Sequence, residues 1–350
     1  MEHIIQPMAA QLHIQPEQIR NTLQLLEEGN TVPFIARYRK EVTKGLDEEQ
    51  IRVIQEQYEY QVNLEKRKED VKRLIEQQGK LTDEIIAGID ACEKLSQVED
   101  IYRPYQQKRK TRASDAAAKG LKPLADWLLQ LYRDADVKAE ARKYLNDKVK
   151  DVESAIQGAE DILAELASDD PAVRQKIRSS MERYGRLTTK EKKKHTDDKK
   201  VYKMYYDYSE RISTLASHRI MAIDRGEKEK VLSVAVDFDK DFITDWTIRR
   251  FTKKRQSPCV PYIEEAVRDG LKRLAFPAVE REIRAQLSEK AHEQSIEVFS
   301  LNLERLLLQP PVKNKMVLGF DPAFRTGCKL AVVDKNGNML DVSVIYPTPP

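Results

Sequence analysis

Residues 48–78 contain neither proline nor glycine, and this uninterrupted run constrains the fold more than any other feature of the sequence. Apolar residues such as Ile51 and Ile54 recur along it at the spacing of one helical face. Asp47 is a suitable N-cap before the run, and Gly79 is a suitable end. Because the whole chain has only 12 glycines and 15 prolines in 350 residues, we predict a mainly helical protein rather than a β-sandwich or barrel.

The composition excludes several classes of protein. Hydrophobic residues make up 40% of the chain, which is enough to fill a core and argues against wholesale disorder. No apolar run approaches the roughly 18 residues of a membrane span, and the first residues lack the pattern of a signal peptide. Cys92, Cys259 and Cys328 lie far apart, so neither a disulfide framework nor a zinc site is indicated. We therefore expect a cytoplasmic protein without membrane contact and without a cofactor.

The last residues differ in kind from the rest of the chain. Strands are predicted at 316–320, 328–334 and 340–346, with a hairpin turn at 335–338. Three antiparallel strands with nothing to cover them do not form a stable domain. We therefore expect that an α/β domain begins here and continues beyond residue 350.

These patterns divide the chain into three parts. The predicted helical N-terminal domain covers residues 1–185. Residues 186–314 hold a linker and a second, mostly helical segment with a short strand near 231–236. The linker is expected at 188–203, which is almost wholly polar and rich in lysine. Residues 315–350 are the predicted start of the α/β domain.

A first basic cluster makes nucleic acid a candidate ligand. The net charge is only +3, from 61 basic and 58 acidic residues, so affinity for phosphate depends on where the charges lie. The cluster contains no acid and comprises Arg103, Lys108, Arg109, Lys110 and Arg112. Tyr102 and Tyr105 are interleaved with it, and aromatic rings stack on the bases of single strands. The alternative is a solvated loop whose arginines pair with helix acids elsewhere.

A second basic cluster, again without an acid, comprises Arg249, Arg250, Lys253, Lys254 and Arg255. In a helix predicted over 241–254, residue 250 would share a face with 254, and 249 with 253. Such a face would bind phosphates. The alternative is the basic C-terminal end of a helix, which the helix dipole favours.

Asp321 ends a predicted strand and opens a loop. A carboxylate fixed at a strand end can ligate a divalent metal for phosphodiester cleavage, although two-metal nucleases need several carboxylates about one site. The alternative is an Asp-Pro turn, because Asp hydrogen-bonds to local backbone.

Several segments along essentially the whole chain form a recognisable series. In order, they are VPFIARYRKE at 32–41, EDIYRPY at 99–105, SHR at 217–219, AIDRGE at 222–227, LGFDPA at 318–323 and RTGCKLAVVD at 325–334. Together they resemble the Tex family of bacterial transcription accessory proteins. The last two segments are similar to the start of the family's YqgF-type domain.

The resemblance implies an elongated, multi-helical N-terminal body with helix-turn-helix-like elements. The first strands of an α/β domain of RNase H-like (YqgF-type) fold would follow it. It also implies that the family's helix-hairpin-helix module and its OB-fold RNA-binding domain would lie beyond residue 350.

The same resemblance places Asp321 at the first-strand carboxylate of an RNase H-like site. Its usual partners would come from later strands and helices, and the loop has Asp-Pro-Ala where many relatives have Asp-Pro-Gly. The family expectation is a domain without nuclease activity. We therefore predict no catalysis, with Asp321 as a candidate vestigial metal ligand and no other metal site.

Our hypothesis from the sequence is a nucleic-acid-binding transcription accessory protein. It would bind RNA or DNA without sequence preference through the basic clusters and would act as a scaffold for the transcription machinery. One alternative is a metal-dependent RNase H-like nuclease that uses Asp321. Another is a helical protein-interaction scaffold that binds RNA polymerase or the ribosome, which suits the charged helix at 48–78. The sequence indicates no oligomeric state.

Overall fold

The computed structural model describes residues 2–106, 110–193, 197, 200–310, 313–323 and 326–347. Within them the chain is mostly helical and has two antiparallel three-stranded sheets, which confirms the predicted fold class. The chain divides into two compact units. Unit 1 holds Met1–Leu215 and Ala222–Leu287, and unit 2 holds Ala216–Met221 and Ser288–Pro350. None of the described helices is long and apolar enough to cross a membrane.

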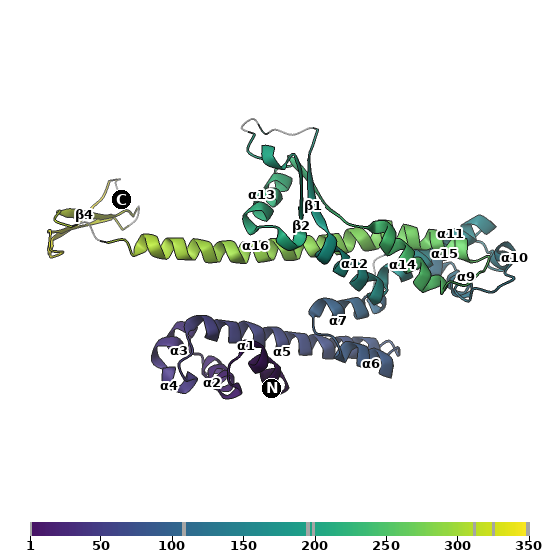
Figure 1. The fold of residues 1–350 in the computed structure, drawn as a ribbon, viewed down its shortest axis with the longest axis horizontal. Helices are drawn as coiled ribbons and strands as arrows, with labels where there is room; N and C mark the ends of the chain where they lie inside the picture. Colours follow the sequence, from purple (N-terminus) through teal and green to yellow (C-terminus); the bar gives the residue numbers. More distant parts are fainter. Residues whose placement is uncertain are drawn as a thin grey trace. The chain divides into compact units, whose positions relative to one another are not determined.

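The first part of unit 1 packs short helices around one long helix (Figure 1). The elements are α1 (Glu2–Leu12), α2 (Pro16–Glu27), α3 (Val32–Tyr38), α4 (Lys40–Thr43), α5 (Glu48–Glu76), α6 (Asp83–Asp90) and α7 (Leu95–Tyr102). The predicted long helix and its cap are confirmed, because the Asp47 carboxylate accepts a hydrogen bond from the Gln50 amide at 2.8 Å. Ile35, Ile51 and Ile54 are fully buried in the local core.

The largest core of unit 1 lies among the helices that follow. They are α8 (Arg112–Ala118), α9 (Lys122–Leu128), α10 (Val137–Arg142), α11 (Val152–Asp169), α12 (Pro171–Tyr184), α14 (Lys240–Thr252) and α15 (Val260–Gly270). A π-helical segment, Leu271–Ala275, joins α15 to the long helix α16 (Phe276–Leu307). A Cβ atom on Gly270 would lie 2.3 Å from the carbonyl oxygen of Ala164. Helix α15 therefore approaches α11 as closely as only glycine allows.

A three-stranded sheet of unit 1 occupies part of the segment that we predicted to be a linker. Strands β1 (Arg186–Glu191), β2 (Asp207–Arg211) and β3 (Leu232–Asp237) pair antiparallel in the order β2-β1-β3 (Figure 1). Strand β3 confirms the strand predicted near 231–236. The linker prediction is wrong for residues 188–191, because they belong to β1, Thr189 is buried, and β1 pairs with strands on both sides. Sheet pairing outweighs the polar local sequence here.

Helix α13 (Ser217–Lys228) precedes β3, and unit 2 contains the second sheet. Strands β4 (Val317–Asp321), β5 (Cys328–Val333) and β6 (Met339–Ile345) form an antiparallel meander, as predicted. Large apolar side chains such as Leu318, Phe320 and Leu340 are exposed on it.

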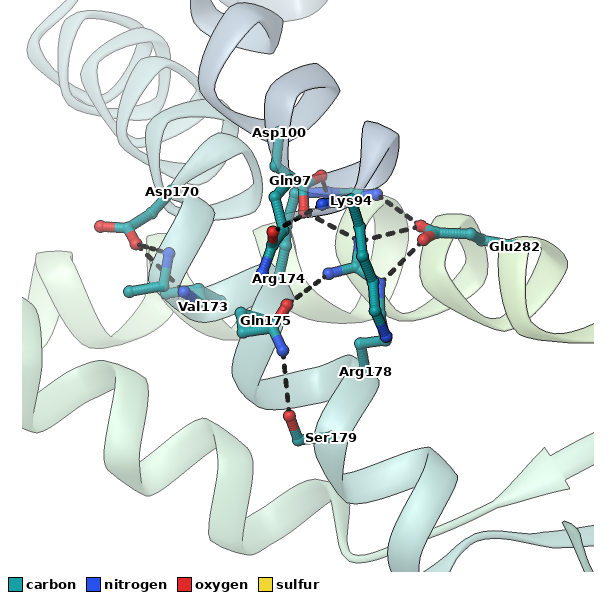
Figure 2. Close-up of polar contacts among 11 residues, drawn as sticks. Lys94, Gln97, Asp100, Asp170, Val173, Arg174, Gln175, Arg178, Ser179 and Glu282 are labelled. Carbon is teal, nitrogen blue, oxygen red and sulfur yellow. Dashed lines mark hydrogen bonds and ion pairs between the residues drawn. The ribbon is translucent and has the colours of Figure 1, made fainter. Parts of the chain in front are cut away.

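A buried ion cluster joins three helices of unit 1 (Figure 2). The carboxylate of Asp100, on α7, accepts hydrogen bonds from Arg174 Nε at 2.5 Å and from Arg178 Nη2 at 2.8 Å, both on α12. Glu282, on α16, accepts from Arg178 Nε at 2.8 Å. The side chains of Asp100, Arg174 and Arg178 are only 5%, 3% and 6% exposed. Burial alone would lower the pKa of Arg178, but its hydrogen bonds to Glu282 and Asp100 outweigh burial and raise that pKa.

Glu160 lies at the contact between α11 and α15, in a cavity of about 460 Å³. The cavity is lined by Arg112, Gln157, Glu160, Asp161, Glu265, Ala266 and Asp269. Burial, reinforced by the charge of Glu265, raises the pKa of Glu160 to about 7. A native carboxyl with a raised pKa keeps a proton that the unfolded chain releases.

We predict that Asp100→Asn destabilises the fold by about 3–5 kcal/mol, because it leaves two buried guanidinium groups without their shared carboxylate. The matched control is the neighbouring Glu99→Gln. Glu99 pairs with Arg67 at 2.5 Å, but the two side chains are 38% and 30% exposed, so its loss should cost less than about 1 kcal/mol. Urea unfolding measures both, and equal effects would contradict the assigned importance of the cluster.

We predict that Glu160→Gln removes a pH dependence of stability. In the parent chain the free energy of unfolding should fall as pH rises from the unfolded value of 4.5 to about 7, where native Glu160 loses its proton. The variant should therefore exceed the parent by about 1–2 kcal/mol at pH 8 and show no advantage at pH 4. Urea titrations across this range test it, with Glu56→Gln on the exposed side of α5 as control. Parallel pH profiles for all three proteins would refute the prediction.

Candidate nucleic-acid interface

The structure divides the first basic cluster. Lys108 and Arg109 lie outside the described residues. Arg103 turns toward the buried ion cluster, where its Nε has no hydrogen-bond partner among the described residues. Burial lowers the pKa of Arg103, and the charge of Arg174 lowers it further. This placement argues against contact between Arg103 and phosphate.

The other two members of the first cluster lie near acids. Lys110 is 84% exposed, and its ammonium is 3.4 Å from the Asp115 carboxylate. Arg112 is exposed at the start of α8, and its charge opposes the rise that burial causes in the pKa of Asp161. In the described part of this cluster, nearby acids thus partly neutralise the positive charge. This fits the alternative of a solvated loop whose basic residues pair with acids.

The second basic cluster lies at the C-terminal end of α14, and its five side chains are exposed. The helix ends at Thr252, and Lys253 and Lys254 adopt left-handed backbone conformations with φ of 50° and 57°. The predicted helix over 241–254 is therefore too long, and the shared faces expected for 250 with 254 and 249 with 253 do not form. Two successive left-handed residues take the chain out of the helix.

Only one cation of this cluster has an ion pair within the part of the chain that the structure describes. Arg250 Nε lies 3.0 Å from Asp170, whose carboxylate also caps α12 by accepting from the Ala172 and Val173 amides. The unpaired members are Arg249, Lys253, Lys254 and Arg255. Four exposed cations at one helix end form a surface that suits an anionic polymer.

An aromatic stripe runs into this basic end. Phe242, Trp246 and Arg250 follow one another at intervals of four residues on α14, so they share one face. The Lys176 ammonium, on α12, lies 5.2 Å from the ring centroid of Phe242 and 5.8 Å from that of Trp246. The Arg250 guanidinium carbon is 5.9 Å from the Trp246 centroid. Phe242 is nevertheless 53% exposed, so the edge of the stripe is open to a ligand.

We call this surface the α14 face and define it by Lys176, Phe242, Trp246, Arg249, Arg250, Lys253, Lys254 and Arg255. The first three of these residues are not among the site residues that we predicted from the sequence. The sequence signal for two of them is a pair of aromatic residues four positions apart, shortly before an acid-free basic run. Residues 246–255 contain no acid, whereas Asp241 directly precedes Phe242 and Asp245 directly precedes Trp246. Positive charge therefore concentrates toward the C-terminal end of the face.

Asp321 is exposed at the end of β4, where it pairs in register with Lys329 of β5. Among the described residues, no group of three or more His, Cys, Asp or Glu side chains could hold a metal ion. The role of Asp321 as a vestigial ligand stays a prediction.

Comparison with known proteins identifies the family. Residues 2–76 match the Tex-like protein N-terminal domain, residues 133–299 the Tex central region-like domain, and residues 315–350 the Tex protein YqgF-like domain. These matches confirm the resemblance of the sequence motifs, including the start of a YqgF-like domain in the last residues.

Full-length relatives give the same result. The chain is 48% identical over 349 residues to the uncharacterized protein YdcI of Bacillus subtilis, covering 99% of this chain and 48% of the relative. It is 36% identical over 352 residues to the transcriptional accessory protein Tex of Neisseria gonorrhoeae, covering 98% and 46%. For the human S1 RNA-binding domain-containing protein 1 the identity is 28% over 358 residues, covering 98% and 36%. The chain spans about half the length, or less, of these relatives, and it belongs to the Tex family.

Proposed function

We propose that this chain binds RNA or DNA without sequence preference through the α14 face, as part of a transcription accessory protein. The observation that carries the proposal is the continuity of that face. An aromatic stripe, in which Phe242 is exposed and Trp246 is half-buried, leads into four cations that have no ion pair within the described residues. Stacking rings beside phosphate-binding cations are the elements that single-strand-binding proteins combine.

The residue types of the α14 face explain the absence of sequence preference. Arg249, Lys253 and Lys254 would contact phosphates, which are the same in every sequence. Phe242 would offer a ring edge and face to a base, and every base has a π-face. The neighbouring Lys176 supplies a further cation beside that ring. The expected ligand is therefore a single-stranded nucleic acid of any base sequence.

The names of the relatives support this proposal. One relative is named as a transcriptional accessory protein and another by an S1 RNA-binding domain. Both proteins are more than twice as long as the matched region, so their names describe more than this chain contains. The α14 face is the feature of the described residues that would let this part contribute to binding.

We also propose that the chain is not a nuclease. Metal-dependent cleavage of a phosphodiester needs several carboxylates about one site, and among the described residues no metal-binding group forms around Asp321. The nuclease alternative requires cleavage that depends on Mg²⁺ or Mn²⁺ and is lost in Asp321→Asn. The proposal expects none.

Scaffolding of RNA polymerase or the ribosome stays a prediction of the sequence analysis. Salt dependence separates it from direct nucleic-acid binding. Neutralised phosphates release counterions, so the affinity for nucleic acid falls steeply as salt increases.

We predict that the double variant Arg249→Glu, Lys254→Glu binds a fluorescein-labelled oligouridylate at least about 10-fold more weakly than the parent at 50 mM salt. The slope of the logarithm of affinity against the logarithm of salt should fall by about 2, because two phosphate contacts are lost. Fluorescence anisotropy at four salt concentrations measures both quantities.

The control is Lys66→Glu, Lys138→Glu, which changes the net charge equally at exposed positions on α5 and α10. It should bind within about two-fold of the parent, because the α14 face is intact. Equal weakening of both double variants would show that only net charge matters and would overturn the proposal. Absence of binding by the parent would overturn it as well.

A further inference from the structure

The junction between α3 and α4 presents an aromatic side chain among cations, apart from the α14 face. Tyr38, the last residue of α3, is 62% exposed. The ring of Phe34 lies beside it in a tilted contact, with centroids 5.2 Å apart and planes inclined by 47°. Arg37 and Lys40 on either side of Tyr38 are exposed. We call Phe34, Arg37, Tyr38, Arg39 and Lys40 the α3 platform.

The fold holds this platform in place. Ile35 and Ala36 are buried in the N-terminal core, so the opposite side of the short helix must face outward. Phe34 and Tyr38 are four residues apart and share that side. The platform therefore rests on the packing of α3 against the core rather than on a free loop.

Arg39 is engaged in contacts within the platform and is therefore not a free cation. Its guanidinium lies 5.1 Å from the ring centroid of Phe34, and its Nη1 donates a hydrogen bond to the Tyr38 carbonyl oxygen at 3.0 Å. The first contact holds the Phe34 ring, and the second satisfies a carbonyl at the helix end. Tyr38 contacts that Phe34 ring and is itself 62% exposed, so part of its ring is accessible to a base.

Arg37 and Lys40 are available to a ligand. Neither forms an ion pair with any residue that the structure describes. The next cation along the chain, Lys44, is already paired with Glu17. Glu41 is the only acid from residue 37 to 44. A single exposed tyrosine would need no explanation. An exposed tyrosine between two cations that have no ion pair within the described residues matches the chemistry of a base flanked by phosphates.

We propose that the α3 platform is a second binding site for single-stranded nucleic acid. A base stacks on Tyr38, and Arg37 and Lys40 contact the neighbouring phosphates. A duplex cannot use the ring, because its bases are already stacked on one another. The inference rests on the proposed function only in taking nucleic acid as the ligand, since the α14 face and the α3 platform share no residue.

The test compares Tyr38→Ala and Tyr38→Phe in the 350-residue chain. Anisotropy is measured with a labelled 12-nucleotide oligouridylate, the corresponding oligothymidylate and a 12-base-pair DNA duplex. Tyr38→Ala should weaken binding of the single strands about 5- to 10-fold and leave duplex binding within about two-fold. Tyr38→Phe keeps the ring and should restore single-strand binding, which separates stacking from a merely structural role. Loss of duplex and single-strand binding alike in Tyr38→Ala, or no loss of either, overturns the inference.

The double variant Arg37→Glu, Lys40→Glu tests the phosphate contacts. It should weaken single-strand binding and reduce its salt dependence, because two cations are lost. A labelled oligoglutamate peptide is the probe for an acidic protein partner. Peptide binding that this variant abolishes, with oligonucleotide binding unchanged, would overturn the inference in favour of that partner.

The two proposals fail separately. If Arg249→Glu, Lys254→Glu abolishes oligonucleotide binding and the α3 variants change nothing, the proposed function stands and the α3 platform is refuted. If the Tyr38→Ala effect persists in the chain that carries the α14 substitutions, the platform is an independent site. If the parent binds none of the oligonucleotides, both fail.

Discussion

The buried ion cluster of Asp100, Arg174, Arg178 and Glu282 is the interaction on which the architecture of unit 1 depends. Its members come from helices far apart in the sequence, and the low exposure of Asp100 makes removal of that single carboxylate costly. Apolar packing has no preferred direction, so it sets how much surface is buried but not which register two helices adopt. Two guanidinium groups on successive turns of α12 that share a carboxylate from α7 do define a register.

Helix α12 connects this cluster to the α14 face. Arg174 and Arg178 point into the cluster, whereas Lys176, between them in sequence, lies over the aromatic rings of α14. Asp170 caps the same helix and pairs with Arg250. A displacement of α12 would therefore move Lys176 away from the rings and disturb the ion pair that Arg250 of α14 makes with Asp170. The position of the proposed binding surface thus follows from buried contacts on the other side of one helix.

Hydrophobic periodicity, capping residues and turn residues predict the local helices and strands of this chain. They do not predict which distant segments pair with one another. The helix from Glu48 to Glu76 with its cap and the three C-terminal strands follow from spacing and turn residues alone. Strand β1 does not, because its polar residues become a strand only through partners on both sides. For the same reason the sequence places Arg103 in a basic cluster, while the fold leaves it half-buried with its Nε inside the protein. The basic run at 249–255 is visible in the sequence. That it adjoins the stripe of Phe242 and Trp246 is visible only in the structure, which shows where α14 ends and where Lys176 lies.

We propose that bases of a bound strand meet aromatic rings on the helical body of this chain. Photo-crosslinking of an oligonucleotide that carries 5-iodouridine, with the modified peptides identified by mass spectrometry, tests this proposal most directly. We expect adducts on the peptides that contain Phe242 and Trp246, and on the peptide that contains Tyr38. Efficient crosslinking confined to strands β4–β6 or to the second half of α16 would contradict it.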